Sequence, residues 1–478
     1  MGVVWGLGLL LSLDGATNAT VAALVGGGGI VSVLLGYRSH RLAQATDRRE
    51  EGKLFNERFG AAAAQLGSER YAVRLAGIYA MAALADDWPE GRQQCIDVLC
   101  SNVRRARMPE PERTVKRKSS SAEYFASHLA WKDDEESQRE MIRIIRDHLI
   151  GEPGISWSDC SFNFSGAVFN NVDFSDSQFR GKVNFSGAVF QSGVHSFARA
   201  KFMGPSTSFV SAVFSGAGTD FRNSWFAGEG VNFDNAHFKD GEIDFARIVL
   251  EGRAVTFRNS VFSGGRIRFY EPVCRAGALD FGGANFCGAE MRVRLHTARA
   301  YMEFCAAHFS GGSIDFALFE SFRINFTSSI FEGSVVDINV GSPVGHASVI
   351  LIDSTFSGGG LSFTCIDSSD LIVDFRQTRL EGGRLEFDYF AASPGSLVFS
   401  DVEKMKAPLI LYGRELSHLE SADFKHGCVD LRRLKGTLPM FTSEQLASGA
   451  VRLPAGAVFQ AGNAGGGERF PDTLPPPS

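Results

Sequence analysis

The sequence predicts a mainly β fold, a solenoid built from a phenylalanine-rich repeat. Two observations carry this prediction. The chain of 478 residues contains 41 Phe against 8 Tyr and 5 Trp, together with 53 Gly, and many of the Phe residues recur every twelve positions. One residue type at one spacing is typical of repeat proteins, in which each unit buries its apolar face against its neighbours.

Two series of apolar residues run through these repeats in a fixed register. The first series is Phe185, Phe197, Phe209, Phe221, Phe233, Phe245, Phe257, Phe269 and Phe281. The second lies five residues after the first and includes Phe190, Phe202, Phe214, Phe226, Phe238, Phe262 and Phe286. We predict that both series form the structural core of the solenoid, because chance does not maintain two apolar registers over so many periods.

Each twelve-residue period predicts two short strands that face one core. Val231 and Phe233 flank the polar Asn232, and residues two apart in a strand lie on the same face. Gly-rich turns alternate with two-residue turns that often end in Asn, as at Asn223, Asn235 and Asn259. Asn tolerates the left-handed backbone conformation that a sharp corner requires.

Upstream of these periods the interval shortens to five residues. Phe164, Phe169, Phe174 and Phe179 are five apart, and the small residues Ala167 and Ser177 stand two positions before a Phe. These residues resemble the pentapeptide-repeat family, whose consensus places Leu or Phe at the centre of five and a small residue two before it. The resemblance covers roughly residues 160–400, and the twelve-residue unit departs from it by two extra residues in every second turn.

The resemblance implies a right-handed, four-sided β-helix whose coils each contain two twelve-residue periods. Each Phe would then stack on the Phe two periods away; a coil of a single period is the alternative. The stretch around Gln65–Ser68 is similar to the segment that precedes the repeats in membrane-anchored bacterial members of the family. The resemblance implies a non-catalytic protein of the interaction type, and it names no partner.

The amino-terminal region predicts a membrane anchor. The apolar stretch 19–37 is long enough to span the hydrocarbon core of a bilayer and would contact lipid. Several Arg residues follow it, and positive charge beside a span tends to remain cytoplasmic. We therefore expect the bulk of the chain on the cytoplasmic side of a bacterial cell membrane, and Val3–Leu13 would be a second membrane helix if the anchor is a hairpin.

Composition and apolar spacing divide the rest of the chain. Apolar residues at helical spacing predict four helices. The first covers about 53–66, the second begins after an N-cap at Ser68, the third covers about 92–105, and the fourth runs from about Glu136 to Leu149. The predicted parts are a transmembrane anchor (1–37), a helical region (38–105), a basic linker (106–121), a helical segment that caps the solenoid (122–151), the solenoid (155–435) and an irregular, largely disordered tail (436–478).

No motif in the sequence indicates an enzyme. Walker A, GxSxG, HExxH and strand-placed GxGxxG patterns are missing, and Asp220, Asp244 and Asp280 form no acid pair with a partnering base. His195 and His296 occupy inward positions of the ladders, where a core histidine is the expected role. We predict no catalytic, cofactor-binding or metal-binding residue. The eight Cys contain no CxxC pair and are interpreted as reduced, mostly buried thiols.

These features favour a membrane-tethered scaffold whose solenoid binds an unknown protein partner. The net charge of −6 predicts no nucleic-acid binding. One alternative is an acidic solenoid that mimics DNA and binds a type II topoisomerase, although basic residues spread along the repeats weaken the mimicry. A second is a carbohydrate-active β-helix, which needs a cleft with paired carboxylates. A homodimer through the glycines at 26–29 is a further option.

Overall fold

The computed structural model describes residues 50–105, 111, 121–151, 155–275, 277–296, 300–341, 346–365, 371–391, 397–398, 409–414, 429–430 and 451–452. Two compact units are present, one ending at Gly91 and one beginning at Arg92, so the boundary falls inside the helical region predicted at 38–105. The predicted anchor at 1–37 lies outside the described residues. Within the described parts, no helix is long and apolar enough to cross a membrane.

The first unit contains a helical segment at 50–66 and the helix α3 (Tyr71–Asp87). A Cβ atom added at Gly77 of α3 would lie 2.5 Å from the Leu66 backbone nitrogen, so the two helices approach closely there. The N-cap of α3 is Arg70, which forms no side-chain cap. The predicted N-cap, Ser68, instead accepts a hydrogen bond from the Arg70 amide through its hydroxyl, at 3.2 Å.

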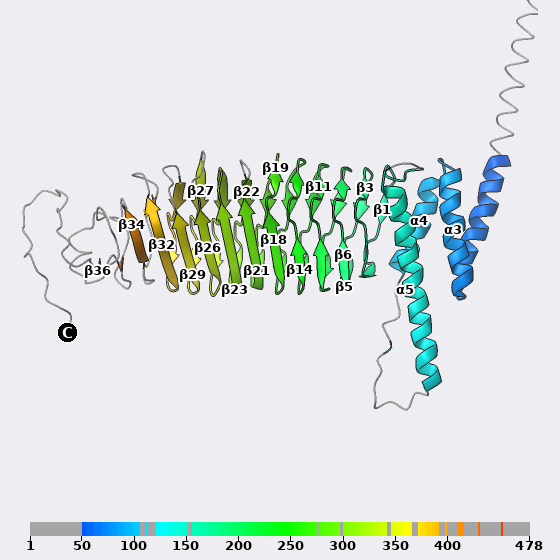
Figure 1. The fold of residues 1–478 in the computed structure, drawn as a ribbon, viewed down its shortest axis with the longest axis horizontal. Coiled ribbons are helices and arrows are strands. Elements are labelled where there is room, and N and C mark those ends of the chain that lie inside the picture. Colours follow the sequence, from blue (N-terminus) through cyan, green and yellow to red (C-terminus); the bar gives the residue numbers. More distant parts are fainter. Residues whose placement is uncertain are drawn as a thin grey trace, which may run out of the picture. The chain divides into compact units, whose positions relative to one another are not determined.

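Two helices of the second unit, α4 (Arg92–Arg104) and α5 (Ser121–Leu149), pack at the start of the solenoid (Figure 1). The Gln93 side-chain amide donates to the Ser161 carbonyl and accepts from the Ser161 amide, both at 2.8 Å. This pairing occupies backbone groups next to the first strand, where an open solenoid would expose an edge. α5 begins well before Glu136, where the apolar spacing predicted its start.

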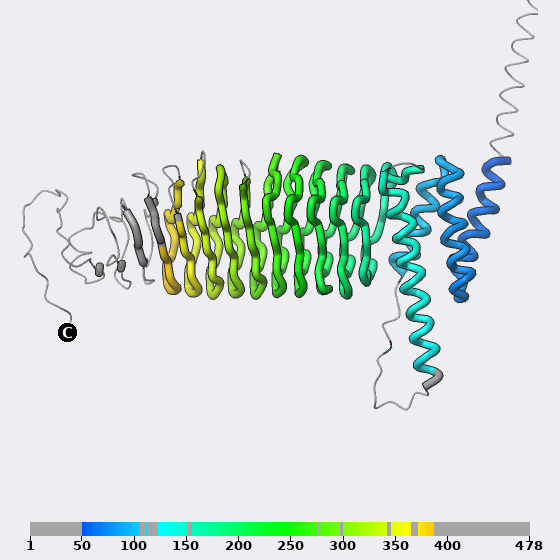
Figure 2. The backbone as a smooth tube through the Cα atoms, in the orientation of Figure 1, coloured from blue at the N-terminus to red at the C-terminus, as the bar shows by residue number. Residues whose placement is uncertain are grey.

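The solenoid consists of parallel strands stacked in columns, with one coil above the next (Figure 2). The first column is β1 (Phe162–Asn163), β4 (Val183–Asn184), β8 (Thr207–Ser208), β12 (Val231–Asn232), β16 (Val255–Thr256), β20 (Leu279–Asp280), β22 (Ala300–Glu303), β24 (Phe322–Asn325), β27 (Ala347–Ile350), β30 (Leu371–Asp374) and β33 (Leu397–Val398). The fourth column is shorter: β3 (Gln178–Phe179), β7 (Lys201–Phe202), β11 (Trp225–Phe226), β15 (Val249–Leu250) and β19 (Val273–Cys274).

The second and third columns share one sheet, because β21 (Asn285–Leu295) and β23 (His308–Leu318) run through both. The second column also contains β2 (Val168–Asn170), β5 (Val189–Ser192), β9 (Val213–Phe214), β13 (His237–Phe238), β17 (Val261–Phe262), β25 (Ile330–Phe331), β28 (Thr355–Phe356) and β31 (Arg379–Leu380). The third contains β6 (Val194–Ser196), β10 (Gly218–Asp220), β14 (Glu242–Asp244), β18 (Arg266–Tyr270), β26 (Val335–Val340), β29 (Gly360–Cys365), β32 (Arg384–Ala391), β34 (Leu409–Arg414), β35 (Val429–Asp430) and β36 (Val451–Arg452).

The cross-section changes along the solenoid. From β4 to β20 each coil has four strands, and Val231 pairs with Val255, two periods further along the chain. Beyond β19 no described strand continues the fourth column, and Leu279 pairs with Met302, Met302 with Ile324 and Ile324 with Val349. The described strands of the later coils therefore occupy three columns, and these coils differ in length from one to the next. Among the described residues, the four-sided prediction is confirmed only for the earlier coils.

Phenylalanine fills the interior of the four-strand coils. Every Phe of both predicted series is at most 2% exposed. Phe233 stacks on Phe209 at 4.7 Å and on Phe257 at 4.9 Å between ring centroids, and it contacts Phe245 edge-on at 5.9 Å. The stacked partners lie two periods apart, so each of these coils contains two periods rather than one.

The last described strand lies within the range expected to be an irregular tail. β36 pairs in parallel with β35, with Val451 beside Val429. The repeat pattern had faded in the sequence before this point, yet the pairing continues the third column. Residues 451–452 therefore form a strand pair beyond the predicted solenoid boundary at residue 435.

Candidate interaction surface

The polar residues at outward strand positions close the turns that follow them. The Asn232 side chain accepts a hydrogen bond from the Asp234 amide at 2.7 Å, and the Asp244 side chain accepts one from the Ala246 amide at 2.9 Å. Such Asx turns replace backbone pairing at a corner. The outward Asn and Asp residues therefore shape the coil, which is a role that the sequence analysis did not assign to them.

The residue after each Asx turn takes the left-handed conformation. The prediction for Asn223, Asn235 and Asn259 is confirmed, with φ values of 58°, 59° and 55°. Arg247 and Glu271 occupy equivalent corners with φ values of 56° and 53°. Their side chains form an ion pair at 3.1 Å, so some corners use charged residues that no turn propensity would have indicated.

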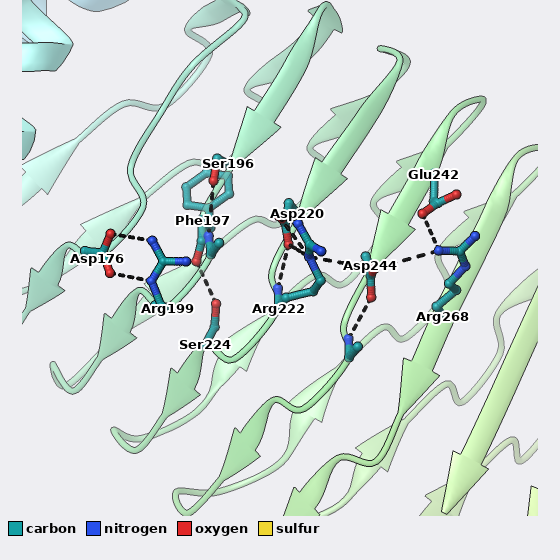
Figure 3. A network of polar contacts seen from close by, with 12 residues as sticks. Asp176, Ser196, Phe197, Arg199, Asp220, Arg222, Ser224, Glu242, Asp244 and Arg268 are labelled. Atoms are coloured by element: carbon teal, nitrogen blue, oxygen red, sulfur yellow. Dashed lines mark hydrogen bonds and ion pairs between the residues drawn. The ribbon is translucent and has the colours of Figure 1, made fainter.

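The three carboxylates considered for catalysis are held by arginine. Arg222 binds Asp220 at 2.6 Å, and Arg258 binds Asp280 at 2.6 Å. Asp244 lies beside Asp220 on the adjacent strand, 3.9 Å from Arg222, whereas Asp280 belongs to the first column. Figure 3 shows Asp220 and Asp244 within a chain of charged contacts along the third column.

A further ion pair stands at a corner next to this column. Arg199 binds both carboxylate oxygens of Asp176, at 2.6 and 2.7 Å (Figure 3). The hydrogen bond from Arg199 lowers the pKa of the Asp176 carboxyl, and the same contact raises the pKa of Arg199. Both groups therefore remain charged at neutral pH.

The two histidines predicted at inward positions differ in their surroundings. His195 is buried, with its Nδ1 3.4 Å from the Val172 amide and no described partner for Nε2. Burial lowers the pKa of His195 to about 4, so the ring is neutral at pH 7. The prediction for His296 is wrong, because this ring is exposed and stacks on the exposed Phe319 at 4.2 Å.

The cysteines are free thiols, but fewer are buried than expected. Cys95 and Cys100 are buried, three others are partly exposed and Cys287 is exposed. Burial raises the pKa of Cys95 to about 11 and that of Cys100 to about 12, so both remain protonated at neutral pH. The side chains of Cys365 and Cys428 lie outside the described parts.

In the described part of the chain, no group of three or more His, Cys, Asp or Glu side chains is placed to hold a metal ion. Comparison of the chain with family models, with curated proteins and with solved structures finds no match. What the geometry offers is a parallel β-solenoid with a closed aromatic core and an outer surface of regularly spaced polar and charged side chains.

Proposed function

We propose that this protein is a non-catalytic scaffold that presents the outer faces of a pentapeptide-type β-solenoid to a protein partner. One observation carries the proposal: several charged outward residues of the four-strand coils, such as Asp220 and Asp280, close turns and form ion pairs. Side chains used in this way give the surface a fixed shape. Repeat proteins use such extended, rigid surfaces for binding.

The proposal includes a right-handed winding and a tether to the bacterial cell membrane through residues 1–37, with the solenoid on the cytoplasmic side. The tether is supported by the apolar stretch and the arginines that follow it. A DNA mimic is less well supported, because Arg222, Arg258 and Arg268 neutralise carboxylates on the surface. These same ion pairs argue against an outward carboxylate that acts as a glycosidase acid or base.

Photo-cross-linking from different faces would test the scaffold function. A photoreactive amino acid would replace His237 of the second column or Val249 of the fourth, both outward positions, in the full chain in its native cells. We expect one face to cross-link reproducibly to a protein of different sequence and the other face to cross-link weakly. Absence of any such product from both faces would contradict the scaffold function.

A further inference from the structure

The outward side chains of the third column, here called the third face, carry charges in blocks. One row along this face, the charged row, runs in register through six consecutive strands: Asp220, Asp244, Arg268, Arg292, Asp315 and Asp337. The order is two acids, two bases and two acids. Like charges on adjacent strands lie about 5 Å apart and destabilise the sheet. Asp220 and Asp244 also close turns, but no such structural role accounts for the like-charged pairs Arg268–Arg292 and Asp315–Asp337.

The basic block exceeds its local acids. β18 and the third-column part of β21 carry Arg266, Arg268, Arg292 and Arg294 outward, against the single acid Glu290. Arg266 and Arg292 both contact Glu290, Arg268 reaches Glu242 on the preceding strand at 2.6 Å, and Arg294 lies over the Tyr270 ring at 5.0 Å. Positive charge therefore remains in excess on these two strands.

The second acidic block lacks a cationic partner among the described residues. Asp315 accepts a hydrogen bond from the Asn339 side chain at 3.3 Å, and Asp337 accepts one from the Ser362 hydroxyl at 2.5 Å. The third-column residues of the two strands, 313–318 and 335–340, include no Lys or Arg. By contrast, Asp220 and Asp244 at the other end of the charged row contact Arg222.

We propose that the third face binds the third face of a second copy of this chain, in antiparallel orientation. A two-fold axis placed between β21 and β23, perpendicular to the length of the solenoid, sets Arg292 against Asp315 of the second copy. The same axis sets Arg268 against Asp337 of the second copy. Both pairs occur twice, so the isologous contact of a two-fold dimer yields four intermolecular ion pairs.

The fit follows from the spacing of the strands. A partner must present opposite charges at four positions separated by the ~4.8 Å interval of adjacent strands, and a second copy has this interval by construction. Neighbouring positions also suit this register, because Arg266 would cover the exposed Val335 of the second copy and Arg294 would meet Ala317. The third face, nine described strands from β6 to β32, offers on the order of 600 Å² per copy, near the ~800 Å² of a standard interface.

The other complementary register is worse. An axis between β14 and β18 would set Asp220 against Arg292 and Asp244 against Arg268 of the second copy. It would also set Arg222 against Arg294 of the second copy, and Asp220 already has Arg222 as a partner within its own chain. The preferred register sets Asp220 opposite Glu386 of the second copy, but each of these carboxylates has an arginine partner within its own chain. Only the preferred register gives an arginine to Asp315 and Asp337, which have no cationic partner among the described residues.

Charge exchange in the full chain would test this dimer. One variant, R268D/R292D, makes the charged row wholly acidic; the other, D315R/D337R, makes its second half wholly basic. Sedimentation velocity should show a dimer for the unchanged chain and dissociation constants at least about 100-fold weaker for each variant alone. Mixing the two variants should restore the dimer, since the new carboxylates of one copy would face the new guanidinium groups of the other while the remaining Arg268–Asp337 and Arg292–Asp315 contacts persist.

The restored mixed dimer also shows that both variants fold. The control partner for R268D/R292D is D220R/D244R, which would restore a dimer only in the alternative register. A monomeric unchanged chain, or variants that dimerise as well as the unchanged chain, would overturn the proposal. The dimer rests on the proposed function only because both use the solenoid as a binding surface. If the dimer were disproved, cross-links from the second and fourth columns to another protein would still support the scaffold function.

Discussion

Single residues in this solenoid divide into a stacked aromatic interior and an outer layer that forms the corners. The inward and outward alternation could be predicted from the sequence, because Phe recurs at one phase and polar residues at the other. The Asx turns could not be distinguished from ordinary solvated positions, since Asn232 is polar in either case. For His195, the inward position could be predicted from the repeat. Whether a hydrogen-bond partner would satisfy its second ring nitrogen could not.

Removal of one aromatic ring should cost far more than removal of its outward neighbour. Phe233→Ala should destabilise the fold by about 3–5 kcal/mol, because a fully buried ring between two stacked rings leaves a cavity. Asn232→Ala should cost about 1 kcal/mol, since it removes only the hydrogen bond to the Asp234 amide. Denaturant unfolding would measure both, with Asn232→Asp as a control that keeps the acceptor. Equal losses for the two alanine variants would disprove the inward and outward assignment.

Acid should destabilise the native state through His195. Its pKa is about 4 in the folded chain against an ordinary 6.5, so the unfolded chain binds a proton first as the pH falls. The contribution of His195 to stability should drop by up to about 3 kcal/mol between pH 6.5 and 4 and should not change further below pH 4. His195→Ile, which copies Ile243 of the same column, should flatten this part of the profile, with the exposed His296→Thr as the control. An unchanged pH profile in His195→Ile would refute the role.

Among the elements, β21 marks the change from four strands to three. Met291, Val293 and Leu295 all point inward and alternate with Arg292 and Arg294, a two-residue period that is typical of one continuous strand. No Gly or Asn interrupts it, so the chain runs straight where earlier coils turn a corner. An alignment of the sequence in fixed units of twelve residues does not show this two-residue alternation. It also hides the charged row, because the later coils differ in length and their strands cannot be found by counting in twelves.

The capping helix α4 should protect the first edge of the solenoid through Gln93. Gln93→Ala removes two hydrogen bonds to Ser161 and should cost about 1–3 kcal/mol, because it leaves backbone groups unpaired. The exposed Gln94 of the same helix provides the matched control, and Gln94→Ala should change stability by less than about 0.5 kcal/mol. Thermal unfolding of both variants would measure the difference. Identical midpoints would show that α4 does not cap the edge.

At the scale of the whole molecule, the scaffold function requires a location as well as a surface. The repeats and their stacking at intervals of two periods were predictable because they are local and periodic. The binding partner and the cellular location do not follow from the repeat. The partner depends on surface charges that only the winding of the coils brings together, and the location depends on a segment that precedes both helices of the first unit. The proposed tether can therefore be tested separately from the fold.

Deletion of residues 1–37 should release the protein from membranes. The apolar stretch 19–37 would be stabilised in hydrocarbon by its length and low charge, and the arginines after it would hold the rest of the chain on the cytoplasmic side. After cell fractionation, the full chain should sediment with membranes and need detergent for extraction, whereas the deletion variant should remain soluble. Deletion of 453–478 is the control and should leave the full chain's membrane fraction unchanged. A full chain that is soluble without detergent would rule out the tether, and a reporter after Ser478 that is active outside the cytoplasm would reverse the topology.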